Sequence, residues 1–153
     1  MIRDNLKATG ELKIVVRGKD GQIKDERVEK NLVVQEGLNV LADRMQQTPT
    51  KGHMTHMAVG TDNTAAANGQ GALVSQLGTR VTLDSTTVTA NAIEYVATFP
   101  SGASTHTGAL VEAGIFNASA EASDMLCRTT FLAVNKGDDD TVTITWTVTI
   151  AAP

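Results

Sequence analysis

Two histidines lie close enough in the chain to suggest a metal site. His53 and His56 are three positions apart in the segment HMTHMAVG, and imidazole nitrogens are common zinc ligands. The apolar residues around them predict a short buried strand over residues 53–60, on which this spacing points the two side chains to opposite faces. His106 follows in a distant loop, and no nearby carboxylate or thiol offers a third ligand. We therefore expect no metal and no cofactor.

A run of three aspartates is the second candidate for chemistry. The segment KGDDDT places Asp138, Asp139 and Asp140 after a glycine, and carboxylates in a turn can hold calcium. The alternating ligand positions and the distal glutamate of an EF-hand loop are missing. We interpret the run as a solvated turn whose charge insulates the next strand from edge-to-edge aggregation.

The single cysteine, Cys127, is the third candidate. It lies in the apolar run MLCRTTF, where a free cysteine behaves as a small buried hydrophobe, and it cannot form an internal disulfide. The chain contains no G-x-S-x-G elbow, no phosphate-binding glycine loop and no H-E-x-x-H motif. We expect that the protein is not an enzyme.

Composition narrows the class of protein further. The chain has 153 residues, of which 41% are hydrophobic and 20% charged, as in one ordinary globular domain spanning residues 1–153. The formal net charge is -4 and no basic stripe is present, which argues against a nucleic-acid partner. Only 3% of the residues are aromatic, which argues against stacking platforms for bases or sugars. The charged start MIRDNLKATGELK is unlike a signal peptide and no apolar run spans a bilayer, so we expect neither export by that route nor a membrane partner.

The first element expected is a β-hairpin over residues 12–34. Its turn is marked by Asp20-Gly21, and its second arm, IKDERVEK, is mostly charged. This arm is either well solvated or faces a polar partner, and its charges discourage uncontrolled edge pairing. Residues 1–33 form an arm that could stand away from a body of residues 34–153. The residues that we expect to contact partners are Lys19, Lys24, Glu26, Arg27 and Glu29.

A short amphipathic helix follows the hairpin. Its apolar stripe falls at helical spacing and is made by Val34, Leu38, Leu41 and Met45. Gly37 weakens the first turn, and Thr48-Pro49 marks the end of the element. We expect this stripe to pack on a sheet.

The rest of the chain is dominated by strand patterns. After an irregular loop over residues 61–71, we expect a helical turn at 72–77, a strand at 80–83 and one strand ending at Pro100. Two apolar runs, 109–119 and 125–135, resemble the arms of a hairpin.

The end of the chain carries the clearest pattern. Over residues 141–150, valine, isoleucine and tryptophan alternate with threonine without a break, which predicts a long antiparallel strand. The fold class expected is therefore mainly β: an antiparallel β-sandwich with one short amphipathic helix and an N-terminal hairpin. The expected core comprises Leu38, Leu41, Val59, Tyr95, Phe99, Phe116, Phe131, Ile144 and Trp146.

Four segments, taken in order, resemble a family of small virion proteins of tailed bacteriophages. They are NLVVQEGLNVLADRM, HMTHMAVGTDNTAA, VEAGIFNAS and MLCRTTFLAVNKGDDDTVTITWTVTI. In that family a helix start of the type N-V-(V/T)-x-x-G-L precedes a strand ending A-(V/I)-G-T and a Thr/Ala-rich loop. The strands E-(A/I)-G-(I/L)-F and R-(T/V)-x-F and a terminal alternating strand come later. The resemblance runs from Asn31 to Ile150 and leaves out the hairpin at 12–30.

Proteins of this family are called collar, tail-fibre, tail or decoration proteins. The resemblance therefore implies a structural protein of the virion, made in the cytoplasm of the bacterial host, and it carries no catalytic motif. We expect a neck, collar or tail component that works as a homo-oligomer and contacts other virion proteins of the portal, neck, tail or capsid. One alternative is a capsid decoration protein. The other is a glycan-binding tail-fibre module that uses the loops at 61–71 and 101–108, with residues such as Asp62 and Asn63.

Overall fold

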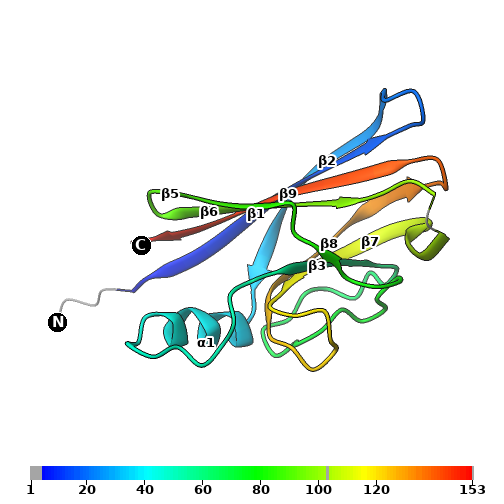
Figure 1. Ribbon diagram of the computed structural model, residues 1–153. Coiled ribbons are helices and arrows are strands. Elements are labelled where there is room, and N and C mark those ends of the chain that lie inside the picture. The colour runs from blue at the N-terminus through cyan, green and yellow to red at the C-terminus, as the bar shows by residue number, and fades with distance from the viewer. Residues whose placement is uncertain (1–4, 103, 153) are drawn as a thin grey trace.

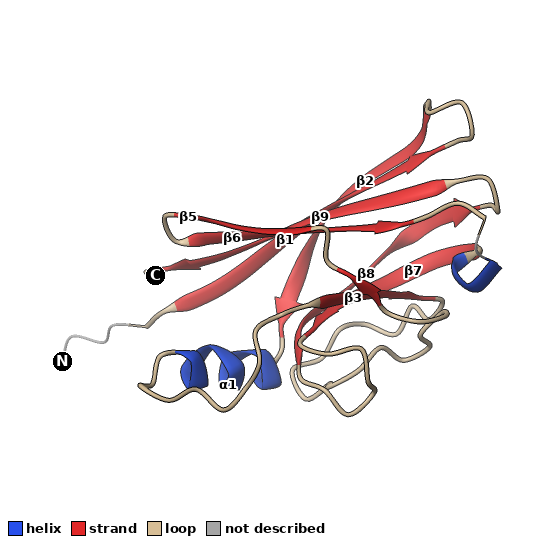
Figure 2. Cartoon of the chain, in the orientation of Figure 1, coloured by secondary structure: helices blue, strands red, loops and turns tan. Residues whose placement is uncertain are grey.

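The computed structural model describes residues 5–102 and 104–152. Residues 1–4 of the expected arm, Ala103 of the loop at 101–108, and Pro153 lie outside the described residues. Figure 2 shows a strand-rich molecule with one α-helix and a short 3-10 helix. The elements are β1 (Lys7–Arg17), β2 (Ile23–Val33), α1 (Gln35–Arg44), β3 (His56–Gly60), β4 (Val81–Thr82), β5 (Ser85–Thr89), β6 (Ala92–Phe99), η1 (Ser104–His106), β7 (Gly108–Phe116), β8 (Met125–Lys136) and β9 (Thr141–Ala151).

All the strands belong to one antiparallel sheet. Its order is β4-β3-β7-β8-β2-β1-β9-β6-β5, and it curls so that the β1-β9-β6 layer faces the β3-β7-β8 layer (Figure 1). β2 joins the two layers, because it pairs with β1 along most of its length but with β8 only through Leu32 and Val33. The expected class, a mainly-β antiparallel fold with an N-terminal hairpin and one helix, is confirmed, and the two layers are halves of a single sheet.

The terminal strand lies at the centre of its layer. β9 pairs with β1 on one side and with β6 on the other. Its Val142, Ile144, Trp146 and Val148 are at most 1% exposed, and the threonines that alternate with them are half-buried on the outer face. The period-two pattern thus gives one inward face, which packs against the β3-β7-β8 layer in the main core.

Most of the expected core residues are buried. Leu41 is partly buried and packs against the main core. Leu38 is 39% exposed, so its assignment to the core was wrong. The residues of the expected core that are buried are Val59, Tyr95, Phe99, Phe116, Phe131, Ile144 and Trp146.

The helix exists, but it turns a different face to the sheet. Gly37 and Val40 are its buried residues, whereas Leu38 and Met45 from the expected stripe are exposed. The physical reason is a close backbone approach: a Cβ at Gly37 would lie 2.1 Å from the carbonyl oxygen of Leu126 in β8. Only glycine permits this contact, and it rotates α1 so that the larger side chains turn toward solvent.

Two other local expectations were wrong. Residues 72–77 form no helical turn; they are irregular and contain one bridge, from Gln76 to Gly60. The strand expected to end at Pro100 is a hairpin, in which β5 and β6 meet at a turn containing Ala90, whose φ is +53°. The sequence carries no glycine at that turn, so the usual signal of a positive φ is missing. The hairpin expected from the two later apolar runs is present as β7–β8.

The N-terminal hairpin is part of the sheet. β1 pairs with β9 from Lys7↔Ala151 to Arg17↔Thr141, and its Leu12, Ile14 and Val16 are buried in the main core. The hairpin turn extends beyond the neighbouring strands (Figure 1). β1 is therefore held on both sides, whereas β2 has no described strand beside one of its sides over part of its length.

Trp146→Ala should lower the free energy of unfolding by about 3–5 kcal/mol, because the indole is buried and large-to-small changes in a core leave a cavity. The indole N–H also donates a hydrogen bond of 2.8 Å to Asn31 Oδ1. Urea denaturation measures the loss. Thr147→Ala, one residue later on the outer face, is the matched control and should change stability by less than about 0.5 kcal/mol. A similarly small loss for the tryptophan variant would contradict the assigned face.

Candidate functional site

The structure places the histidines in three different settings. His53 is exposed in the loop before β3, and His56 begins that strand. His106 is buried; its Nε2–H donates to the Thr79 carbonyl oxygen at 2.7 Å, and its ring meets Phe99 edge-on. Across residues 5–102 and 104–152, no three His, Cys, Asp or Glu side chains are grouped so as to hold a metal ion.

Cys127 is fully buried in β8. Burial disfavours the thiolate and raises the pKa of this thiol well above its ordinary value. A protonated thiol without solvent access is a poor nucleophile, so Cys127 fills space in the core, as the sequence indicates.

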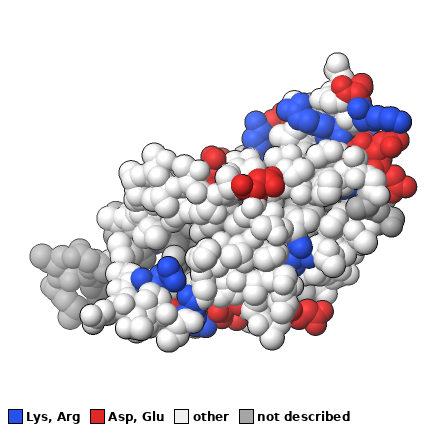
Figure 3. Space-filling model, in the orientation of Figure 1, with Lys and Arg blue, Asp and Glu red and all other residues white. Residues whose placement is uncertain are grey.

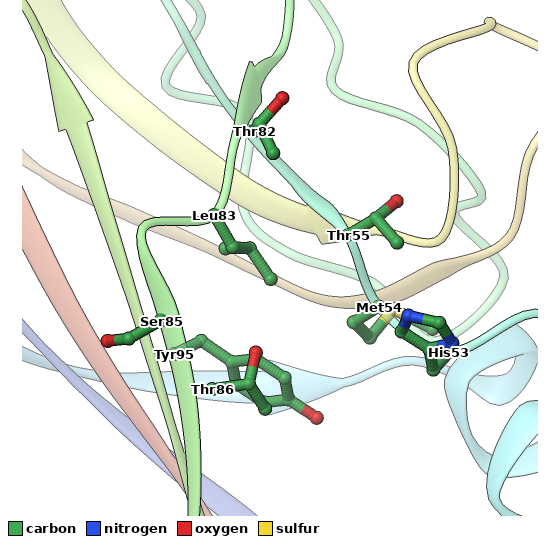
Figure 4. Close-up of a pocket in the computed structure, with 8 residues that line it drawn as sticks. All are labelled: His53, Met54, Thr55, Thr82, Leu83, Ser85, Thr86 and Tyr95. Atoms are coloured by element: carbon green, nitrogen blue, oxygen red, sulfur yellow. The ribbon is translucent and has the colours of Figure 1, made fainter.

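A small pocket opens beside β3 and β6 (Figure 4). Its volume is about 330 Å³, and its lining includes His53, Thr86 and Tyr95. Burial raises the pKa of the Tyr95 hydroxyl to about 12, so this hydroxyl stays protonated at neutral pH. The described lining also includes the Ser85 hydroxyl, and it includes no carboxylate, thiol or lysine.

The aspartate run is less solvated than the sequence suggests. Asp138 and Asp139 are exposed, but Asp140 is only 4% exposed. Its Oδ2 accepts hydrogen bonds from Lys24 Nζ at 2.7 Å and from the Gly137 N–H at 2.8 Å. These interactions, the lysine above all, hold the pKa of Asp140 below its ordinary value. Asp140 therefore anchors the start of β2 to the turn that precedes β9.

A buried ion pair lies on the outer side of the β3-β7-β8 layer. Glu112 of β7 and Arg128 of β8 are both 0% exposed. Arg128 donates to Glu112 Oε2 from Nη2 at 2.7 Å and from Nε at 3.0 Å. Both side chains are fully buried, and an unpaired charge there would be very costly.

The same two side chains hold the long loop between β3 and β4. Glu112 accepts backbone hydrogen bonds from Val74 at 3.0 Å and Ser75 at 2.7 Å. Arg128 Nη1 donates to the Thr64 carbonyl oxygen at 2.9 Å and to Gln70 Oε1 at 3.1 Å. The irregular segment that contains Asp62 and Asn63 is thus held against the sheet by the buried Glu112–Arg128 pair.

Gly60 is needed for this arrangement. A Cβ at this position would lie 2.3 Å from both Glu112 Oε1 and the Ser75 carbonyl oxygen. The end of β3 can approach the ion pair closely only because glycine has no side chain.

Arg80 fixes a second loop in a similar way. Its guanidinium lies 3.6 Å from the centre of the Phe116 ring, and Nη1 donates to the carbonyl oxygens of Ala118 and Ala120. The loop between β7 and β8 is therefore also tied to the sheet.

Charged side chains gather over the hairpin. Figure 3 shows lysine, arginine, aspartate and glutamate concentrated at the end formed by the β1–β2 turn. The five expected contact residues all lie on this hairpin, and three of them form ion pairs within the chain. These residues are Lys19, Lys24, Glu26, Arg27 and Glu29.

Alternate residues of β2 face opposite sides of the sheet. Asp25, Arg27 and Glu29 are half-buried on the face that β1 turns to the core, and Arg27 pairs with Asp25 through Nη1. On the outer face, Glu26 pairs with Lys13 at 2.8 Å. Val28, on this same face, is 56% exposed. β2 thus has charges on both faces, unlike the other strands of its layer.

One side of β2 has no strand partner over residues 23–30 in the described part of the chain. The Lys30 carbonyl oxygen accepts a hydrogen bond from Thr129 Oγ1, and the Val34 N–H donates to Leu126 in β8. Backbone groups of even-numbered residues therefore point away from β1. Before Lys30 the two strands diverge, and no described strand pairs with this side of β2. We call residues 23–30 the open β2 edge.

The buried ion pair was not predicted from the sequence. Glu112 and Arg128 lie in the segments VEAGIFNAS and MLCRTTF, and the available signal was a single charge within each apolar strand. Two such charges of opposite sign on strands expected to pair predict a buried partner.

The comparisons with known proteins give no neighbour. No protein-family model, no curated protein and no solved structure matches the chain. No helix in the described part of the chain is both long and apolar enough to cross a membrane.

Glu112→Gln should lower the free energy of unfolding by about 3–5 kcal/mol, because it leaves Arg128 as a buried charge without its counter-ion. Amide hydrogen exchange in residues 64–75 should accelerate as the loop loses its anchor. Glu26→Gln breaks an exposed pair and is the matched control, with an expected loss below about 1 kcal/mol. Equal losses in the two variants would contradict the anchoring role.

Asp140→Asn should make stability less dependent on pH in acid. A carboxyl group whose pKa is lowered in the folded state stabilises the protein above its unfolded pKa, near 3.8, and loses this contribution as the pH falls through the folded value. The difference in unfolding free energy between wild type and variant should be largest at about pH 6 and vanish in strong acid. Urea titrations across this range measure it, with exposed Asp139→Asn as control. If the difference in unfolding free energy between wild type and Asp140→Asn stayed constant with pH, Asp140 would not have a lowered pKa in the folded state.

Proposed function

We propose that this chain is a non-enzymatic structural protein of a tailed-phage virion, an oligomeric neck, collar or tail component that mediates assembly. The proposal begins from the resemblance of residues 31–150 to small virion proteins. Its partners are further copies of the chain and neighbouring virion proteins, and its location is the virion.

The observation that carries the proposal is how the residues in the resembling segments are used. Gly37 brings the helix onto β8, Gly60 lets β3 approach the ion pair, and Glu112 and Arg128 hold the long loop. Each of these residues maintains shape, and none of them lines the pocket beside β3 and β6. These residues keep the helix, the strand end and the loop in fixed positions, and a structural protein needs such a rigid surface.

The hairpin supplies the means of assembly. It has charged residues on both faces and an open edge on a strand that is otherwise fixed to the sheet. Strand edges bind partners through main-chain hydrogen bonds, while charges select the partner and register. Repeated copies turn such individually weak contacts into a durable ring.

Quantitative mass spectrometry of purified virions tests the proposal. We expect the chain in every particle at a small fixed copy number relative to the major capsid protein. A copy number comparable with that of the capsid subunit would replace the neck or tail role by decoration of the head. Absence from the particles would overturn the proposal.

A further inference from the structure

The open β2 edge has a charge pattern that is complementary to itself. Around Val28, the chain reads Glu26, Arg27, Val28, Glu29 and Lys30. Within these five residues, each of the two charges before the valine is matched, at the same distance after it, by a charge of opposite sign. Two copies of this segment, placed antiparallel with Val28 at the centre, bring Arg27 of each against Glu29 of the other. The same register brings Glu26 of each copy against Lys30 of the other.

Neighbouring registers lack this property. A pairing centred on Arg27 sets that residue against itself and sets Asp25 against Glu29. A pairing centred on Glu26 sets two copies of that carboxylate directly opposite each other. Like charges that face each other across strands are destabilising, so the charges favour the register centred on Val28.

One unsatisfied side-chain atom agrees with this register. Arg27 Nε is buried and has no hydrogen-bond partner within the described residues, while the Arg27 side chain as a whole is 32% exposed. The register sets Arg27 opposite Glu29 of the second copy, whose carboxylate is an acceptor.

The charges that lack partners agree with this pairing. Glu29 and Lys30 take part in no ion pair among residues 5–102 and 104–152. A second copy supplies Arg27 to the first of them and Glu26 to the second. Val28, more than half exposed in one copy, packs against Val28 of the other.

We infer that the open β2 edge binds a second copy of this chain, antiparallel and across a two-fold axis at Val28. Because backbone groups of even-numbered residues point away from β1, the N–H and C=O of Val28 meet those of the second copy and form a reciprocal pair of hydrogen bonds. The contact is self-complementary and closed, so it forms a dimer. This inference rests on the proposed function only for the expectation that the protein acts as an oligomer.

The other exposed edge in this layer does not specify a partner. β5 (Ser85–Thr89) is exposed along its whole length but contains no charged residue. It has no pattern that selects a register, and its Val88, 69% exposed, provides a control position for the experiment.

Disulfide trapping tests the register directly. In a hydrogen-bonded antiparallel pair the two Cα atoms lie about 5.5 Å apart, within the range that a disulfide spans. Val28→Cys should form a covalent dimer as the main product under mild oxidation, whereas Val88→Cys should stay monomeric. The native Cys127 is buried and does not interfere. A monomeric Val28→Cys protein, or equal cross-linking of both variants, would overturn the inference.

Charge exchange separates a contact between copies from an effect within one chain. Glu26→Lys alone sets lysine against Lys30 of the second copy, and Lys30→Glu alone sets glutamate against Glu26. Each variant should weaken dimerisation about tenfold in sedimentation equilibrium. An equimolar mixture should recover dimers, because each chain then meets opposite charges. Circular dichroism confirms that both variants fold.

The outcome of mixing is decisive, since an intrachain defect cannot be repaired by another chain. Without recovery, the β2 register is wrong even where both variants are folded. The copy number in virions is an independent measurement. Presence in virions without trapping at Val28 therefore rejects the dimer alone, and trapping without presence in virions rejects the proposed function alone.

Discussion

The desolvated pair Glu112–Arg128 is the interaction on which the β3-β7-β8 layer depends. Each ion loses its water, at a cost of several kcal/mol, so every remaining hydrogen-bonding position must find a protein partner. The carboxylate takes two backbone N–H groups and the guanidinium takes a carbonyl and an amide oxygen from the same loop. Strand register, loop path and the small residue at Gly60 are thus coupled, since none can change without leaving a buried charge unsatisfied.

Local patterns were sufficient for the long strands β7, β8 and β9 but not for the rotation of the helix or for the β5–β6 hairpin. The strict alternation in β9 and the two apolar runs of β7 and β8 identify their elements because period two is decided by neighbouring residues. The face of α1 was wrong because the contact of Gly37 with the Leu126 carbonyl oxygen depends on a residue far along the chain. The β5–β6 turn was missed because Ala90 adopts a conformation that its side chain does not favour.

The open β2 edge, too, could be predicted only in part, because it depends on residues that are distant in the sequence. A charged hairpin arm is visible in the sequence, and so are the residues on it. Whether one of its edges is open depends on the strand order, in which β2 lies between β8 and β1 and separates from β8 before Lys30. The burial of Asp140 likewise requires Lys24, which lies on a strand more than a hundred positions earlier. Contacts of this kind are set by topology, which no local pattern contains.

The pairing of the first strand with the last has a consequence for how the chain folds. β1 lies between β2 and β9, and its partners on β9 run from Thr141 to Ala151. During synthesis, the β1–β2 hairpin therefore emerges early, with the apolar face of β1 uncovered. The second partner of β1, strand β9, is synthesised only after almost all of the chain between them. Long-range pairing of this type slows folding and leaves apolar strand surface exposed in the meantime. The charges of β2 protect the nascent chain during this interval, because they keep its free edge from pairing with unrelated strands.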